Sequence, residues 1–318
     1  MSRVKIFIYL SSGVLGLLVI VSLLRSSDED SSSTKIVYQG DNAISIVTEV
    51  KETPVEQKVV LGDIPTVDRV QEFFNIHSPQ LPIVETITYK SRTDWKKGKS
   101  AWLSDYASHF KTSRHFIARS LNGKIDYLKQ NVKDGDRFNI LKSDFPFEFY
   151  LVLDVSRLKL WLFYVDLENN TNEMLKSYSV SIGREDSTRP SGLLTPLGKY
   201  TLGDKIMIYD PKMMGHFLGE KTEMIRVFGT RWIPFEKEIG ECSAPAKGYG
   251  IHGVPWIENP LTGELKEDLT SIGKYDSDGC VRLATSDIEE LYAIIVSRPT
   301  TIEIVKDFYE STIPGGNN

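Results

Sequence analysis

The feature with the greatest consequence for the fold is a run of 19 residues without a charged side chain, residues 6–24. A helix of that length, rising about 1.5 Å per residue, is about 28 Å long and matches the hydrocarbon core of a bilayer. Arg3 and Lys5 precede the run, and cationic flanks favour the cytoplasmic side. We therefore expect residues 1–25 to be a single-pass transmembrane anchor in the inner (cytoplasmic) membrane, with the rest of the chain on the periplasmic side. A cleaved secretory signal is the alternative.

Charge and cysteine content exclude several classes of protein. Lys and Arg number 38 against 43 Asp and Glu, a net charge of -5, so no general basic face for nucleic acid is expected. Two cysteines, Cys242 and Cys280, rule out a disulfide-dense scaffold and a four-cysteine zinc site. His109 and His115 are six residues apart, which is not the spacing of a helical metal-ligand pair, so we expect both on the surface.

The segment after the apolar run divides into two parts. Residues 26–65 are polar and carry clustered charge, which predicts a flexible linker. Residues 66–146 are globular in pattern, with a strand over 86–90, a helical stripe over 102–110, a second helix from Ser113 to Asn122, and an alternating strand over 136–140.

This βααβ order, with Leu121-Asn122 closing the second helix and a Gly-Asp turn before the last strand, resembles the lysin motif (LysM). That fold binds the N-acetylglucosamine-containing glycan of cell walls, so the resemblance implies glycan strands as a partner. The motif's opening Gly-Asp-Thr-Leu-like element is replaced here by residues 95–103. Trp95 and Trp102 in that replacement are expected to pack in a core.

Residues 147–308 have the pattern of a mainly β domain. Apolar runs over 149–155 and 159–164, another strand over 176–182, and a turn and strand over 195–202 favour a mostly antiparallel sheet. The helical stripe over 286–296 predicts a helix with Ser286 as its N-cap and Glu289 at the third position beyond it. Residues 309–318 are expected to be a tail.

Two short motifs in this domain carry chemistry. One is Tyr-Gly-Ile-His-Gly at 249–253, and the other is Ser-Asp-Gly-Cys-Val-Arg-Leu at 277–283. A cysteine thiol needs a base to act as a nucleophile near neutral pH, and a histidine can take that proton and return it to a leaving amine. Cys280 and His252 are the candidate pair.

The neighbours of Cys280 suit the same chemistry. Gly279 lets a carbonyl approach the backbone, so the amides of Gly279 and Cys280 could hold a developing oxyanion. Arg282 lies on the same side of an extended chain as Cys280 and could hold a substrate carboxylate. Ser277 and Tyr249 are further candidates for substrate contact.

The region from 147 to 307 resembles the L,D-transpeptidase catalytic domain of the YkuD type, which cross-links or trims bacterial peptidoglycan. The resemblance rests on five ordered blocks: Leu153-Asp154-Val155, Thr195-Pro196-x-Gly198, Gly229-x-Arg231-Trp232, and the two motifs around His252 and Cys280.

The resemblance implies an antiparallel β-sandwich and a thioester acyl-enzyme on Cys280, formed with release of a terminal D-amino acid. It implies that His252 is base and acid, that the Gly253 carbonyl orients its ring, and that donor and acceptor stem peptides are the partners. No metal and no organic cofactor is implied. Asp278 stands where the family commonly has histidine. His252 and Cys280 are 28 positions apart, which exceeds the usual gap and predicts a surface loop over 258–271. The alternatives are an L,D-carboxypeptidase and a non-catalytic peptidoglycan-binding scaffold.

Overall fold

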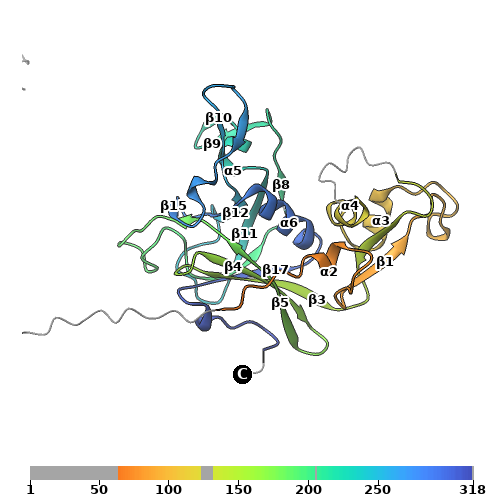
Figure 1. Cartoon of the computed structure of the whole chain (residues 1–318). Coiled ribbons are helices and arrows are strands. Elements are labelled where there is room, and N and C mark those ends of the chain that lie inside the picture. The colour runs from red at the N-terminus through yellow and green to blue at the C-terminus, as the bar shows by residue number, and fades with distance from the viewer. Residues whose placement is uncertain (1–63, 123–131, 205, 317–318) are drawn as a thin grey trace, which may run out of the picture. The chain divides into compact units, whose positions relative to one another are not determined.

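The computed structural model describes residues 64–122, 132–204 and 206–316, and residues 64–318 form one compact unit (Figure 1). The predicted anchor, residues 1–25, and nearly all of the predicted linker lie outside the described residues. Within the described ranges, no helix is long and apolar enough to cross a membrane.

A nine-stranded mixed sheet organises the C-terminal part. Its strands, in spatial order, are β16 (Val281–Leu283), β12 (Gly250–Gly253), β11 (Arg231–Ile239), β7 (Gly198–Leu202), β17 (Thr300–Val305), β3 (Phe147–Asp154), β4 (Lys159–Asp166) and β5 (Thr171–Ser179), with β8 (Met207–Ile208) beside β11. Three two-stranded pairs accompany it: β6 (Ile182–Gly183) with β15 (Tyr275–Ser277), β9 (Met214–Phe217) with β10 (Glu220–Glu223), and β13 (Trp256–Glu258) with β14 (Leu265–Glu267). The helices here are α5 (Ile225–Phe228), α6 (Thr285–Ile295), η2 (Leu269–Ser271) and η3 (Phe308–Glu310).

The expectation of a mainly β C-terminal part is confirmed, and most strand pairs of its large sheet are antiparallel as expected, although the sheet is mixed. β17 pairs with β3 in parallel, and β12 pairs with β16 in parallel. Both parallel pairs join strands far apart in the chain, and α6 lies between β16 and β17 along the chain. The alternation of side chains along a strand does not show whether its neighbour in the sheet is an antiparallel hairpin partner or a parallel strand far away in the sequence.

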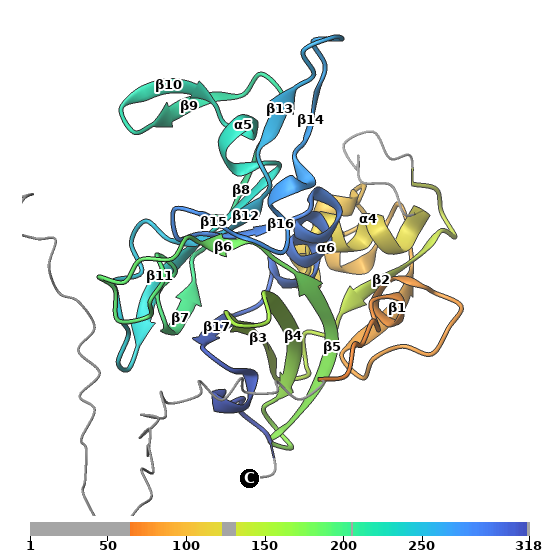
Figure 2. The same ribbon diagram turned by 60° about the vertical axis from the view of Figure 1, so that its left-hand side comes forward.

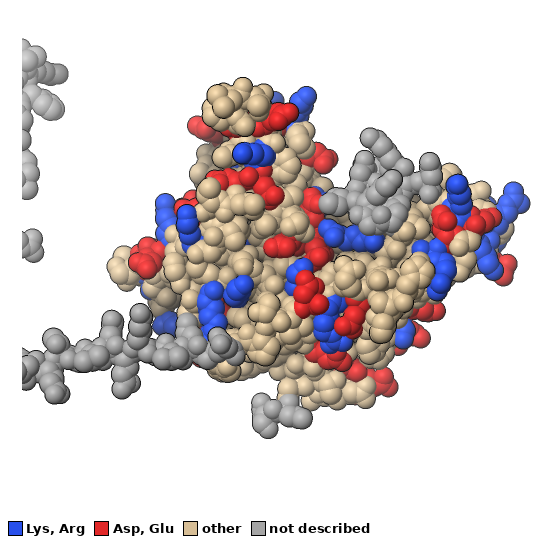
Figure 3. Space-filling model, in the orientation of Figure 1, with Lys and Arg blue, Asp and Glu red and all other residues tan. Residues whose placement is uncertain are grey.

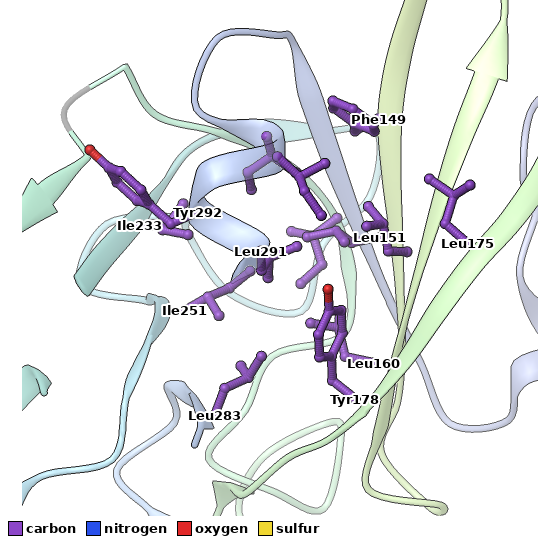
Figure 4. Packing of buried hydrophobic residues seen from close by; sticks show 14 of the residues in the cluster. Phe149, Leu151, Leu160, Leu175, Tyr178, Ile233, Ile251, Leu283, Leu291 and Tyr292 are labelled. Atoms are coloured by element: carbon purple, nitrogen blue, oxygen red, sulfur yellow. The ribbon is translucent and has the colours of Figure 1, made fainter. Parts of the chain in front are cut away.

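The central strands are buried on both faces, which explains their nearly unbroken apolar runs. One face of β3 and β4 carries Phe149, Leu151 and Leu160 into the main core against α6 (Figure 4). The other face carries Trp161 and Phe163 into a second cluster, which η3 and the residues after it cover through Phe308 and Ile313. The C-terminal tail is therefore a structural cover for the sheet.

The middle segment has the expected order of strand, helix, helix and strand. β1 (Val84–Thr88) pairs antiparallel with β2 (Arg137–Leu141), and η1 (Asp94–Lys96), α3 (Leu103–His109) and α4 (Arg114–Asn122) lie between them in the chain, after the short helix α2 (Gln71–Phe74). Ser113 caps α4 through its hydroxyl, which accepts from Phe116 N–H at 3.0 Å. The lysin-motif interpretation and the domain boundaries given above stay predictions.

Two expectations for the middle segment are wrong. Trp102 is 70% exposed and Trp95 is 36% exposed, stacked on His109 with ring centroids 4.3 Å apart, so neither is a core residue. His115 is half-buried with its ring against Tyr292 of α6, because α4 packs on α6. Burial, with nearby arginines, lowers the pKa of His115 to about 3.

The start of α6 also differs from the expectation. The helix begins at Thr285, with Ala284 at the N-cap and no side-chain cap. The Thr285 N–H instead donates to the carboxylate of Glu267 in β14 at 2.8 Å, so a distant strand supplies the acceptor. Glu289 is buried against Arg231 of β11, 3.4 Å away, and takes no part in a capping box with Ser286.

Candidate active site

The two motifs predicted from the sequence meet at neighbouring strands. β12 carries His252 and β16 follows Cys280, and the strands pair with His252 opposite Arg282. Cys280 precedes Arg282 by two residues, so the thiol and the imidazole belong to diagonal positions on adjacent strands. The thiol lies 3.8 Å from the Gly248 carbonyl oxygen, at the entry to β12. Figure 2 shows β12 and β16 side by side beneath the β13–β14 hairpin.

His252 is buried and held in one tautomer. Its Nδ1–H donates to the Gly253 carbonyl oxygen at 2.7 Å, which leaves the Nε2 lone pair free to accept a proton. The rings of Phe228 and Trp232 lie 5.3 Å and 5.7 Å from the imidazole ring, centroid to centroid. Burial lowers the pKa of His252 to about 3, so the ring is neutral near pH 7.

Cys280 is also neutral at rest. Burial of the thiol raises the pKa of Cys280 to about 11, although the Gly250 amide and the Arg282 charge oppose that rise. The site therefore holds a thiol and an imidazole, and not a thiolate with an imidazolium ion. A thiol in this state can act as a nucleophile only if it gives up its proton during the attack.

The loop from 277 to 280 is held by an internal hydrogen bond network. The Ser277 hydroxyl accepts from Gly279 N–H at 3.1 Å and donates to the Cys280 carbonyl at 2.6 Å. Ser277 is 1% exposed, so its geometry favours holding the backbone over touching substrate. Of the two amides expected to hold an oxyanion, that of Gly279 is therefore occupied by Ser277, whereas the described residues show no acceptor for that of Cys280.

Gly279 occupies a position that no other residue fits well. Its φ is +118°, and a Cβ there would meet the Tyr249 ring at 2.6 Å and the Leu194 carbonyl oxygen at 2.9 Å. Tyr249 therefore forms a wall directly behind the nucleophile loop. This contact gives the half-buried Tyr249 a packing function at the site.

The charged residues near the thiol are paired. Arg184 donates to Asp278 at 2.6 Å, and both side chains are exposed. Asp278 contributes only the smallest of the effects on the pKa of Cys280. Arg282 contacts Asp276 at 3.4 Å, while its Nε is buried without a partner among the described residues. On the face shown in Figure 3, basic and acidic side chains are interspersed.

The long interval between the two motifs is more ordered than expected. Instead of a plain surface loop it contains the hairpin of β13 and β14 followed by η2. Arg226 of α5 donates to Glu258 of β13 at 2.9 Å, and Trp256 donates to the Thr285 hydroxyl at 3.2 Å. Glu267, at the other end of the hairpin, caps α6, so the hairpin is joined to the scaffold beneath the site.

Cys242 lies outside this arrangement. Both cysteines are free, so the structure contains no bridge between them. Cys242 packs behind Gly198, with its sulfur 3.2 Å from the Lys199 carbonyl oxygen. A pocket of about 530 Å³ is lined by residues such as Glu148, Lys237 and Arg298, and it includes none of the predicted site residues.

Sequence reasoning missed two of the residues that surround the pair, Phe228 and Thr195, and named Trp232 only within the Gly229-x-Arg231-Trp232 block. Phe228 and Trp232 lie against the imidazole, and Thr195, fully buried, binds the Gly279 carbonyl through its hydroxyl at 2.9 Å. The Thr-Pro-x-Gly block contained Thr195, but nothing in the chain indicates that residue 195 would lie against residue 279.

Comparisons with known proteins found a family model and a set of solved structures. Residues 148–304 match the family model described as the L,D-transpeptidase catalytic domain, YkuD. Among solved structures, Bd1075 of Bdellovibrio bacteriovorus is 18% identical with a TM-score of 0.34, covering 52% of this chain and 50% of its own. The helical cell shape determining protein Pgp2 of Campylobacter jejuni is 14% identical with a TM-score of 0.33, covering 53% and 50%. An L,D-transpeptidase fragment from Xylanimonas cellulosilytica is 14% identical with a TM-score of 0.28, covering 50% and 60%.

The chain spans about half the length of the first two of these structures. No curated protein matches it.

Proposed function

We propose, from the premise that residues 148–304 belong to the YkuD family of L,D-transpeptidase catalytic domains, that this chain forms peptidoglycan cross-links through an acyl-enzyme on Cys280. The observation that carries the proposal is the parallel pairing of β12 and β16. This pairing brings the sequence motif that contains His252, whose imidazole is neutral and oriented, beside the motif that contains the thiol.

In the proposed reaction, Cys280 attacks the carbonyl that precedes the terminal D-amino acid of a donor stem peptide. Its proton passes to Nε2 of His252 as the sulfur–carbon bond forms, and the resulting oxyanion accepts from the Cys280 amide. Collapse of this intermediate breaks the carbon–nitrogen bond, and His252 returns the proton to the leaving amine. A side-chain amine of a second stem peptide then displaces sulfur by the same route in reverse.

Acylation by a carbapenem tests the catalytic part of this proposal. The β-lactam carbonyl takes the place of the donor carbonyl, and ring opening leaves a thioester whose mass equals one added ligand. Intact-mass spectrometry of the purified full-length chain should show that adduct on the wild type and none on Cys280→Ala. A wild type that gains no carbapenem mass, like Cys280→Ala, would refute a catalytic thiol and leave the non-catalytic scaffold.

The fate of the acyl group distinguishes cross-linking from trimming. Incubation with tetrapeptide-containing wall fragments, followed by muropeptide analysis, should yield cross-linked dimers together with free D-amino acid. Tripeptides without dimers would show that water is the acceptor and would make the protein an L,D-carboxypeptidase.

We also propose that residues 1–25 anchor the protein in the inner membrane and that the middle segment contacts glycan strands. The apolar run at 6–24 supports the first, and the exposed Trp102 supports the second. Recovery of the full-length chain in the soluble fraction after cell lysis would refute anchoring. Unchanged sedimentation of Trp102→Ala with insoluble peptidoglycan would remove that tryptophan from glycan contact.

A further inference from the structure

A single buried hydroxyl connects the nucleophile loop to the rest of the sheet. Thr195 Oγ1 accepts from Gly183 N–H at 2.7 Å and donates to the Gly279 carbonyl at 2.9 Å. Thr195 has no exposed surface, and Gly183 lies so close to it that a Cβ on residue 183 would stand 2.5 Å from Thr195 N. The hydroxyl thus uses one acceptor and one donor function, and both partners are backbone groups.

The bond to Gly279 determines where the next amide points. The Gly279 carbonyl and the Cys280 N–H belong to one peptide group, and in a planar trans peptide they point in opposite directions. No cis peptide bond occurs among the described residues. Because the carbonyl is turned inward to Thr195, the Cys280 N–H is turned away from the protein interior.

The neighbouring peptide groups are held by a different side chain. Ser277 binds the Gly279 N–H and the Cys280 carbonyl, so it fixes the groups before and after the central one. The peptide group between Gly279 and Cys280 depends on Thr195 alone among the hydroxyl groups of the described residues. Its N–H, which belongs to the cysteine itself, has no acceptor among the described residues.

We propose that Thr195 is a positioning residue that aims the Cys280 amide at the oxyanion of the acyl-transfer intermediate. Thr195 does not touch substrate; it acts by holding the peptide group that does. The inference rests on the proposed function, since it concerns an oxyanion that only the acyl-transfer reaction forms.

The test compares two reagents that attack the same sulfur. A carbapenem forms an oxyanion on its carbonyl when sulfur attacks it, whereas iodoacetamide is attacked at a saturated carbon, releases iodide and forms no oxyanion. We expect Thr195→Val to slow carbapenem acylation of Cys280 about 10- to 100-fold, because a misaimed donor loses most of the transition-state stabilisation that one amide supplies. The rate at which iodoacetamide alkylates Cys280 in Thr195→Val should stay within about twofold of the wild-type rate. Both reactions are followed by mass spectrometry of the peptide that contains Cys280.

Two further variants distinguish aiming from general damage. Thr195→Ser keeps the hydroxyl and should restore acylation to within about threefold of the wild type. Thr112→Val is the matched control, because the buried Thr112 hydroxyl has no hydrogen-bond partner among the described residues and lies in the middle segment; its rates should be unchanged. Should Thr195→Val fail to fold, Thr195→Ala against Thr195→Ser makes the same comparison.

The outcomes separate the two proposals. A wild type that carbapenem does not acylate refutes the proposed function, and this inference falls with it. A wild type that is acylated, with Thr195→Val equally fast, overturns the inference and leaves the function standing. Equal slowing of acylation and alkylation would also overturn it, because that result indicates displacement of the sulfur and not of the amide.

Discussion

The burial of the Cys280 thiol and the His252 imidazole predicts an unusual dependence of thiol reactivity on pH. The pKa of Cys280 is raised to about 11 and that of His252 is lowered to about 3, in each case chiefly by burial. An ordinary cysteine has a pKa of about 8.5 and is about 9% thiolate at pH 7.5, whereas a thiol with a pKa of about 11 is about 0.03% thiolate. Alkylation of Cys280 by iodoacetamide at pH 7.5 should therefore be about 300-fold slower than that of a free cysteine.

The shape of the profile is the stronger part of this prediction. Alkylation should rise about tenfold per pH unit from pH 6 to pH 9 without a plateau, because the reactive form is the rare thiolate. Carbapenem acylation should be nearly constant over the same range, because the neutral thiol and the neutral imidazole that carry it are both fully populated.

The assay is peptide-resolved mass spectrometry after timed quenching, which separates Cys280 from Cys242 in each digest. The His252→Ala variant is the control: it should lose acylation while its alkylation profile keeps the same slope. An alkylation rate that levels off below pH 8 would refute the reasoning, since it would show a thiolate held by an imidazolium ion at rest.

Two further predictions concern stability. The folded state keeps His115 neutral, whereas the unfolded chain protonates it below about pH 6.5, so the wild type loses unfolding free energy as the pH falls below that value. In His115→Leu this loss between pH 6.5 and 4.5 should be smaller by up to about 1.4 kcal/mol per pH unit, measured by denaturant titration. An unchanged slope would contradict the burial of that ring. Gly279→Ala should destabilise the fold by about 3 kcal/mol, because φ is +118° and the new Cβ meets Tyr249 and Leu194. The control is Gly273→Ala, at φ +80° in open space, which should cost about 1 kcal/mol. Equal losses of unfolding free energy in the two variants would show that the contact with Tyr249 and Leu194 does not matter.

Local sequence patterns predicted those parts of the fold that depend on neighbours in the chain. Alternation and apolar runs identified the strands that became β3 and β4, and helical spacing identified α3, α4 and α6. The same patterns failed at the start of α6, where Glu267 from another strand supplies the cap. They also failed at Trp102, whose aromatic character indicated a core that does not enclose it.

The chemistry followed the same division. The sequence by itself was enough to single out Cys280 and His252 as candidates, because a cysteine between Gly279 and Arg282 and a histidine within its own motif are local signals. Only the tertiary structure decided the surroundings of these two residues. The parallel pairing of β12 and β16 joins positions 30 residues apart, and the Thr195 hydroxyl binds the carbonyl of Gly279, 84 residues further along the chain. Burial by residues from several elements keeps the Cys280 thiol and the His252 imidazole neutral. Hydrogen-bond direction and desolvation are set by which groups surround an atom in space, and the order of residues along the chain does not specify those surroundings.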